Sequence, residues 1–367
     1  MKKNLTISFI GGVAISVIAL YFAFRDVPVA DLFKYLASID YFWVLPAVMT
    51  SIISFILRAF RWRIILESAK RISIWSAIHP LMIGFMINCV LPGRLGEVAR
   101  PVVLQKKEKV PFPTGLATVV AERMFDIILL LLLFILTIGV LKIDPELNVA
   151  FGKYQLNRDT LQAVFNGMLK LGVILIAGIV LFSIHRLREF IYSVIRSTPK
   201  LFFFAGQRFK ASYKKSVCEP VINILNNVAQ GFILVRYPKK IIICFVYSML
   251  IWGLQALSYY LFSLGSPGIN LTYYEITAVM VIICFFIALP SAPGFWGLWE
   301  AGGVFALSLF GVSAKDAAGF TLANHAIQVI PVIIAGFASA MILSVNIRQL
   351  SYAGQEYRRQ QPTVKPD

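Results

Sequence analysis

Charged residues are scarce in this chain of 367 residues. Asp, Glu, Lys and Arg make up 14% of it, 58% is hydrophobic, and the mean hydropathy is +0.76. A soluble globular domain is typically about 25% charged and roughly 45–50% apolar. The shortage of charge therefore excludes an ordinary soluble domain and indicates an integral membrane protein.

Acidic residues are rarer than basic ones, with 18 Asp and Glu against 35 Lys and Arg and a net charge of +17. The basic residues lie between apolar segments, as in cytoplasmic loops that face anionic lipid headgroups. A nucleic-acid-binding protein would gather them on one face. We therefore do not expect nucleic acid as a partner.

Cysteine and histidine are also few. The four cysteines form no C-x-x-C pair and the three histidines show no ligand spacing, so the sequence predicts no disulfide framework, no metal site and no cofactor. It contains no Walker loop, G-x-S-x-G, H-E-x-x-H or Rossmann fingerprint. We therefore expect a protein that is not an enzyme.

Long apolar segments are abundant. Each can cover a hydrocarbon core of about 30 Å at about 1.5 Å per residue; they are 5–24, 42–66, 114–141, 161–184, 241–263 and 321–345. The first is longer than a typical signal peptide core and is read as a retained helix. Two further apolar regions, 74–105 and 274–310, are interrupted by proline, glycine and charged residues.

Basic residues orient these segments. The chain is basic at 58–71 and again at 106–109, so the region between begins and ends on the cytoplasmic side. It is predicted to be a re-entrant hairpin with arms 74–91 and 95–105. The second interrupted region enters from the opposite face by the same reasoning. Both termini are expected in the cytoplasm, and the protein in the cytoplasmic (inner) membrane.

The two halves follow the same order, helix, helix, broken hairpin, helix, in opposite orientations. PGRLGE at 92–97 resembles PGFWGLWE at 293–300, and we assign hairpin formation to Pro92, Gly93, Gly96, Pro293, Gly294 and Gly297. The sequence thus predicts an all-α polytopic membrane protein of about six spanning helices plus two re-entrant hairpins in an inverted repeat, as in transporters. Its single membrane domain, 1–346, would hold a first repeat, 1–143, and a second, 161–346.

The segment 185–240, within the second repeat, mixes aromatic and basic residues. It is predicted to form amphipathic helices on an anionic lipid surface, although a plain cytoplasmic connector explains it equally well. The polar tail 347–367 is expected to be disordered.

Charged side chains inside apolar segments each cost at least about 2.5 kcal/mol on insertion scales, so they are functional candidates. In the first hairpin, Arg94, Glu97 and Arg100 recur every three residues and would share a helix face. A helix starting near Leu95 would offer free N–H groups as a phosphate cradle. The alternative is an interfacial cap in which Arg94 and Glu97 only pair.

Three more charged residues lie about eight residues into segment 114–141, in the motif AERMFD. Glu122, Arg123 and Asp126 cannot all face lipid. They are expected beside the first hairpin, either paired with its arginines or lining a hydrated path.

Glu300 is the charged residue of the second hairpin. Its neighbours Trp296 and Trp299 have an alternative reading as interface anchors, with the hairpin serving only for packing. The other polar cluster in this half, Asn324, His325 and Gln328, favours interhelical hydrogen bonds over a proton relay.

Three arginines, Arg58, Arg61 and Arg63, end segment 42–66. Anchors that snorkel to the interface are the favoured interpretation, and contact with a lipid headgroup is the alternative. With that alternative included, the candidate substrate-binding residues are Arg61, Arg94, Glu97, Arg100, Glu122, Arg123, Asp126 and Glu300.

Three motifs give the chain a family resemblance. N-x-x-LPGRLGE-x-x-R at 88–100, AER-x-x-D at 121–126 and P-x-x-PG-x-x-G-x-x-E at 290–300 resemble the transmembrane domain family of lysylphosphatidylglycerol synthase/flippase. The resemblance covers about 1–346 and implies a membrane domain that moves or holds lipids. Two-domain members add a soluble aminoacyltransferase domain, which is expected to be absent here, so lysyl transfer is not expected.

Two functions follow as hypotheses. The first is a lipid translocase that binds an anionic phospholipid or polyprenyl-linked headgroup at the broken helices. The second is a non-transporting accessory protein that presents a lipid-linked substrate to a glycosyltransferase or synthase and docks through 185–240. A third, weaker alternative is an enzymatic membrane site, for which no nucleophile is recognisable. A homo-oligomer or an enzyme partner is compatible with the sequence.

Overall fold

The computed structural model describes residues 2–25, 27–67, 69–91, 94–140, 149–151, 154–156, 166–167, 170, 173, 185–201, 206–222, 237–289 and 292–345. The described chain is helical, which confirms the predicted all-α class of membrane protein, apart from one small hairpin. That hairpin consists of two antiparallel three-residue strands, β1 (Val149–Phe151) and β2 (Tyr154–Leu156).

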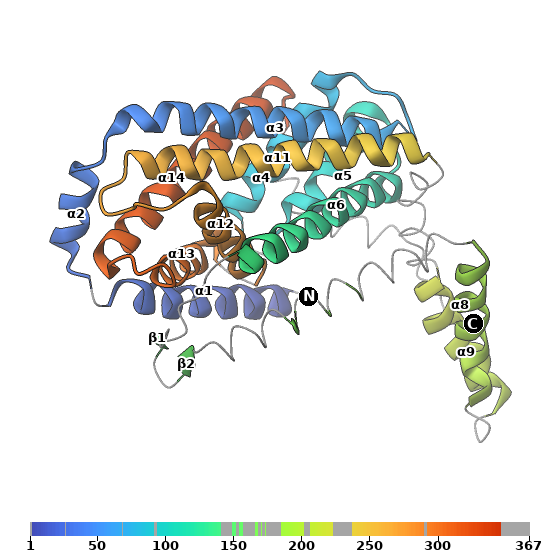
Figure 1. The fold of residues 1–367 in the computed structure, drawn as a ribbon. Helices are drawn as coiled ribbons and strands as arrows, with labels where there is room; N and C mark the ends of the chain where they lie inside the picture. Colours follow the sequence, from blue (N-terminus) through green and yellow to red (C-terminus); the bar gives the residue numbers. More distant parts are fainter. Residues whose placement is uncertain are drawn as a thin grey trace.

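Most of the described helices form one bundle (Figure 1). They are α1 (Lys2–Phe24), α2 (Val29–Ala37), α3 (Val44–Leu66), α4 (Ile74–Val90), α5 (Gly96–Glu108), α6 (Phe112–Val140), α11 (Pro238–Leu264), α12 (Tyr273–Ala288), α13 (Leu298–Ser308) and α14 (Ala314–Ile342), with the 3-10 turns η1 (Tyr41–Trp43) and η5 (Pro293–Phe295). The basic segment contributes α8 (His185–Ser197), η2 (Thr198–Leu201), α9 (Gln207–Tyr213) and the π-helical turn η3 (Lys214–Cys218).

Local sequence signals explain where the hairpin arms begin and end. Ser73 caps α4 by accepting the N–H of Ser76, and Thr272 caps α12 in a capping box with Glu275. Each helix then stops before a leucine in extended conformation, Leu91 or Leu289, that precedes a proline. Proline disfavours helical geometry in the residue before it, so both breaks follow from the Leu-Pro dipeptide.

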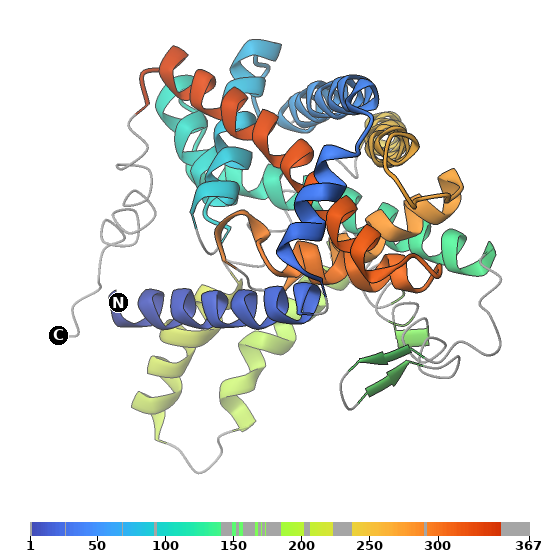
Figure 2. The same cartoon turned by 90° about the vertical axis from the view of Figure 1, so that its left-hand side faces the viewer.

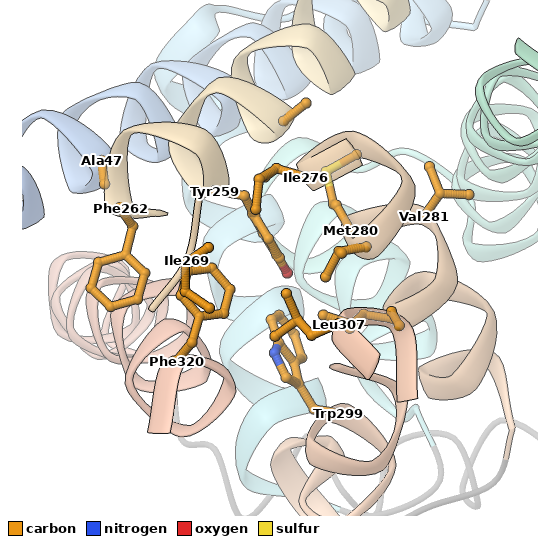
Figure 3. Packing of buried hydrophobic residues seen from close by; sticks show 14 of the residues in the cluster. Ala47, Tyr259, Phe262, Ile269, Ile276, Met280, Val281, Trp299, Leu307 and Phe320 are labelled. Atoms are coloured by element: carbon orange, nitrogen blue, oxygen red, sulfur yellow. The ribbon is translucent and has the colours of Figure 1, made fainter. Parts of the chain in front are cut away.

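The antiparallel helices α3 and α11 lie side by side along one edge of the bundle (Figure 1). The arms of the hairpins pack across the two halves, because α4 contacts α14 while α12 contacts α6. Between α11, α12, α13 and α14 lies the largest group of buried apolar side chains, in which Tyr259 extends from α11 toward Trp299 of α13 (Figure 3).

Three helical segments are long and apolar enough to cross a membrane by length and composition: Tyr41–Leu66, Pro238–Leu264 and Ala314–Ile342. A fourth follows if α1 and α2, bent by 75°, form one span. Helices α4 and α12 are apolar but shorter, as expected for hairpin arms. The predicted total of about six spans and the repeat boundaries stay predictions.

Several boundaries differ from the sequence-based expectations. Helix α14 begins at Ala314, where Ser313 accepts the N–H of Asp316, rather than at 321, because a cap and not hydrophobicity sets its start. Helix α2 was not expected. Most of the predicted helix 161–184 and all of the tail 347–367 lie outside the described residues.

Helix α8 supports the amphipathic interpretation of the basic segment. It carries Arg186, Arg188 and Arg196, and exposes Phe190 and Val194. Figure 2 shows α8 and α9 beyond α1, on the side of the bundle away from α3 and α11. Binding of this segment to anionic lipid stays a prediction.

Candidate functional site

Arg61 of α3 lies at the centre of a buried group of charged side chains. Its guanidinium donates to Asp126 at 2.8 Å, to Glu122 at 3.3 Å and to the hydroxyl of Ser248 at 2.6 Å. Arg61 and Glu122 are 0% exposed. Helix α3 supplies the arginine, α6 the carboxylates and α11 the serine, so three helices far apart in the sequence build this site.

Two more arginines bind the same carboxylates. Arg100 of α5 donates to Glu122 at 2.6 Å, and its guanidinium lies 4.2 Å from the ring centroid of Trp62, in a cation–π contact. Arg123 donates to Glu122 at 3.0 Å and lies 3.5 Å from Asp126. Its side chain is 29% exposed, so this edge of the group is accessible.

Arg58, in the preceding turn of α3, is buried but weakly paired. Its Nη1 lies 3.8 Å from Asp126 Oδ2, and its Nε has no hydrogen-bond partner among the described residues. Its guanidinium faces the ring of Phe85 at 5.8 Å, which Arg100 and Arg123 also approach, at 5.9 and 5.7 Å. Three guanidiniums therefore converge on one aromatic ring of α4.

We call this group the arginine cluster; it consists of Arg58, Arg61, Arg100, Glu122, Arg123 and Asp126. Four guanidiniums against two carboxylates leave an excess of two positive charges. The neighbouring Arg94 and Glu97 carry one charge of each sign and do not change the balance. Unbalanced buried charge is strongly unfavourable, so the cluster is suited to an anion.

The chemistry of the arginine cluster is that of anion binding. Guanidinium groups donate paired hydrogen bonds to phosphate and carboxylate oxygens, and the Nε atoms of all four arginines of the cluster, Arg58 and Arg123 included, lack acceptors among the described residues. Within the described part of the chain, no group of three or more His, Cys, Asp or Glu side chains could hold a metal ion.

The structure corrects the interpretation of Arg58 and Arg61 as snorkelling anchors. Both are buried and face the carboxylates of α6, whereas Arg63 is 38% exposed and only loosely paired with Glu67, at 3.9 Å. Counting basic residues near a helix end could not reveal this, because the acidic partners come much later in the sequence. One signal in the sequence could have revealed it. The motif AERMFD holds two acidic residues and one arginine inside an apolar segment, so one carboxylate needs a cationic partner from another helix.

The start of α5 also differs from the expectation. Arg94 precedes the helix at a φ of 53° and donates to the carbonyl of Ile287 in α12 at 2.5 Å, so it does not share a face with buried Arg100. The N–H of Gly96 is bound by the Asn88 side chain at 2.8 Å, and the next two N–H groups bind the preceding carbonyls. The helix start therefore offers no free phosphate cradle, because its N–H groups already have acceptors.

Glu300 of the second hairpin is 0% exposed and has a histidine partner. Its Oε1 lies 2.5 Å from His325 Nδ1, and its Oε2 accepts the N–H of Gly297 at 2.7 Å. The other ring nitrogen of His325 lies 2.8 Å from the carbonyl oxygen of Gly294. Trp299 is 8% exposed and stacks on His325 with centroids 4.5 Å apart, so it is not an interface anchor.

The hairpin-forming residues occupy different environments. Gly96 lies so close to the backbone of Gly84 that a Cβ could not fit between the arms. Gly294 and Gly297 have φ values of +72° and +89°, which L side chains rarely adopt, and Pro293 begins η5. Two of the predicted residues lie outside the described ones, Pro92 and Gly93.

Gln328 of α14 forms hydrogen bonds with polar side chains of α3 and α11. Gln328 accepts hydrogen bonds from Gln255 at 2.7 Å and Ser51 at 3.1 Å, and donates to Ser258 at 2.9 Å, as predicted for an interhelical contact. Asn324, one turn earlier, is 0% exposed, and its amide atoms have no partner among the described residues.

Comparison with known proteins assigns the family. Residues 9–336 match the family model described as the lysylphosphatidylglycerol synthase TM region. The matched range includes the arginine cluster and the second hairpin. The chain therefore belongs to this family, as its three motifs predicted.

Two curated relatives cover most of the chain. Glycosyltransferase AglD of Haloferax volcanii is 23% identical over 363 residues, 93% of this chain and 55% of that protein, so the chain spans about half the length of this relative. The UPF0104 membrane protein PH1989 of Pyrococcus horikoshii is 25% identical over 350 residues, 92% of this chain and 96% of that protein. No solved structure matches the chain.

Proposed function

We propose that this member of the lysylphosphatidylglycerol synthase transmembrane-region family is a lipid translocase that binds an anionic headgroup in the arginine cluster. The headgroup belongs to a membrane phospholipid or a polyprenyl-linked lipid, whose hydrocarbon chains stay in the bilayer while the polar part crosses. The protein lies in the cytoplasmic membrane with both termini in the cytoplasm.

The excess positive charge of the arginine cluster carries this proposal. Arg61 with Asp126 and Arg100 with Glu122 form two short ion pairs, at 2.8 and 2.6 Å, that balance each other's charge. Arg58 and Arg123 are the surplus. A phosphodiester or phosphomonoester brings the one or two negative charges that would balance them, and it would offer acceptors to their unpaired Nε atoms.

The packing of the two halves supports movement around this site. Helices α4 and α5 of one hairpin contact α14 and α6, and helices α12 and α13 of the other contact α6 and α14. Such reciprocal packing is expected of an inverted repeat, in which one half rocks against the other around a fixed site. The arginine cluster lies where the first hairpin, α3 and α6 meet.

Translocation of fluorescent phosphatidylglycerol in proteoliposomes tests the proposal. The double variant Arg58→Gln/Arg123→Gln removes the surplus cations and leaves both short ion pairs in place. We expect its rate to fall at least about tenfold, since lost charge-assisted hydrogen bonds are each worth about 1.5–3 kcal/mol and about 1.4 kcal/mol corresponds to a factor of ten.

The matched control is Arg63→Gln/Lys240→Gln, which removes two cations that pair with the partly exposed Glu67. It should keep the wild-type rate. Equal rates for wild type and the Arg58/Arg123 variant would overturn the proposal. Mass spectrometry of lipid copurified with the wild type, and lost from that variant, would separate phospholipid from polyprenyl-linked lipid.

A second function has one observation in its favour. The relative AglD is described as a glycosyltransferase, and this chain matches 55% of it, so a membrane domain of this kind could present a lipid-linked substrate to such an enzyme. The same proteoliposomes discriminate the two functions. A presenting protein would bind anionic lipid through the arginine cluster yet translocate none.

A further inference from the structure

The two polar contacts of the His325 ring indicate how many protons this histidine and Glu300 hold together. The carbonyl oxygen of Gly294, 2.8 Å from Nε2, can only accept, so Nε2 carries a hydrogen. On the other side, Nδ1 lies 2.5 Å from Glu300 Oε1. A bare nitrogen and an ionised carboxylate oxygen would repel each other at that distance, so one more proton lies between them, on Nδ1 or on Oε1.

We infer that Glu300 and His325 form a proton-binding site that controls the break of the second hairpin. The site binds one proton, shared by a carboxylate of α13 and an imidazole of α14. Proton binding stands independently of lipid transport. Its use as a driving force for transport rests on the function proposed above.

Burial favours the protonated pair. Both side chains are 0% exposed, and with the shared proton their combined charge is zero, either as imidazolium with carboxylate or as two neutral groups. Without that proton the pair would carry one buried negative charge with no cation bound to it, which is costly in an apolar interior. Burial of both side chains therefore favours the pair that holds the shared proton.

Aromatic rings reinforce the site. The centroids of Trp299 and Trp296 both lie 4.5 Å from the His325 ring, and the Trp299 ring is nearly parallel to it, at 2°. Indole faces attract cations, including imidazolium. Trp299 also stacks on Tyr259, with ring centroids 6.4 Å apart, the arrangement seen between α11 and α13 in Figure 3.

Other elements packed around the pair bring few titratable groups. Helix α11 supplies Tyr259 and α12 supplies Cys284, which interacts with it electrostatically. Helix α4 supplies Cys89, whose carbonyl lies at Gly294, and the start of α5 supplies Arg94, over the ring of Phe295 at 5.9 Å. Described residues of α1 present Ser16, a hydroxyl that accepts the N–H of Ala292.

The pair clamps a stretch of backbone that contains one strained residue. Phe295 has a φ of 64°, which in a residue other than glycine persists only when the surroundings hold it. It lies between Gly294 and Gly297, whose φ values of 72° and 89° are accessible to glycine. His325 binds the carbonyl of Gly294, and Glu300 binds the N–H of Gly297. Once the proton leaves, Nδ1 and Oε1 repel each other, so His325 must give up one of its two bonds and the break is released.

The protons can be counted in the intact protein in detergent. The chain has three histidines, so labelling histidine with the heavy nitrogen isotope gives few ring signals by NMR, and infrared absorption detects a protonated carboxylic acid. At neutral pH we expect either an imidazolium at His325 or a carboxylic acid at Glu300, lost as the pH is raised. The signal should vanish in His325→Gln and Glu300→Gln but persist in the control His79→Gln, which alters another histidine of the bundle.

The coupling of proton binding to lipid transport is tested by measuring translocation under an imposed pH gradient. The wild-type rate for phosphatidylglycerol should change at least threefold when the gradient is applied, and Glu300→Gln should respond to no gradient. A neutral His325 beside an ionised Glu300 at every pH would overturn the proton site, whatever the transport result. If the shared proton is found but the wild-type rate does not depend on the pH gradient, only the coupling of proton binding to transport is overturned. If no translocation is seen at all, the proposed function is contradicted, and the NMR and infrared measurements still decide whether Glu300 and His325 share a proton.

Discussion

The two hairpins share an architecture but are held by different chemistry. Each has a capped apolar helix, a break at a Leu-Pro dipeptide, and a second helix at whose start a backbone N–H binds a side chain. At the first break the amide of Asn88 binds the N–H of Gly96, and at the second the carboxylate of Glu300 binds the N–H of Gly297. An amide does not titrate near neutral pH, whereas a carboxylate–imidazole pair can.

Charge is also divided unevenly between the hairpins. The first lies beside a cluster with two surplus positive charges, and the second contains one carboxylate, which pairs with the imidazole of His325 in α14. The difference shows that the two breaks are held by side chains of different charge. We therefore propose anion binding for the first hairpin and proton-dependent control for the second.

The largest effect is expected from breaking the arginine cluster at its centre. Arg61→Ala removes the 2.8 Å ion pair with Asp126 and the bonds to Glu122 and Ser248, so that Arg123 alone still contacts both carboxylates. Breaking a buried ion pair costs about 3–5 kcal/mol. The protein should lose its folded state in detergent or melt far below wild type, as measured by tryptophan fluorescence during heating. Arg63→Ala, on the same helix, should change stability by less than about 1 kcal/mol because its pair is exposed. Equal melting of the two variants would contradict a central role for Arg61.

Close packing of the hairpin arms gives the next effect. A Cβ at Gly96 would overlap the carbonyl oxygen of Gly84, whereas one at Gly302 would lie 2.9 Å from Cβ and Cγ of Phe286, which is a smaller overlap. We expect Gly96→Ala to destabilise by about 1–3 kcal/mol and Gly302→Ala by less. Gly253 of α11 has open space at its Cβ position, so Gly253→Ala should be neutral or stabilising. A reversed order of Gly96→Ala and Gly302→Ala would show that the first hairpin is not the tighter one.

The clamp of the second hairpin gives an intermediate effect. Glu300→Ala leaves the N–H of Gly297 and the ring of His325 without their buried acceptor, which should cost about 1–3 kcal/mol. Glu300→Gln keeps an oxygen that can accept the N–H of Gly297, as the amide of Asn88 does for Gly96 at the first hairpin, so it should cost less. Thermal melting of the three proteins checks this order. Equal melting of wild type and Glu300→Ala would contradict a clamp at this break.

The smallest effect is expected at the contact between the hairpins. Arg94 is exposed and donates one hydrogen bond to the carbonyl of Ile287. Arg94→Ala should lower stability by no more than about 1–2 kcal/mol, because water replaces an exposed bond. Urea or thermal melting of the two proteins checks this value. A loss as large as that of Arg61→Ala would mean that the hairpins depend on each other through this arginine.

Local features of the structure could be read from the sequence. The predicted arms 74–91 and 95–105 match α4, which ends at Val90, and α5, which begins at Gly96. These limits depend on a capping serine and a proline, which act on adjacent residues. Glu122, Arg123 and Asp126 were placed beside the first hairpin for a similarly simple reason, since charge at that depth must be paired.

The sequence by itself therefore determined the class of protein, the positions of most described helices and the family. It could not decide that Arg58 and Arg61 point inward, that Asn88 occupies the start of α5, or that His325 rather than an arginine meets Glu300. Hydropathy and capping act within a few residues of the chain, whereas the partner of a buried charge is set by how distant helices pack. Only the tertiary structure brings α3, α5 and α6 close enough for four guanidiniums to share two carboxylates.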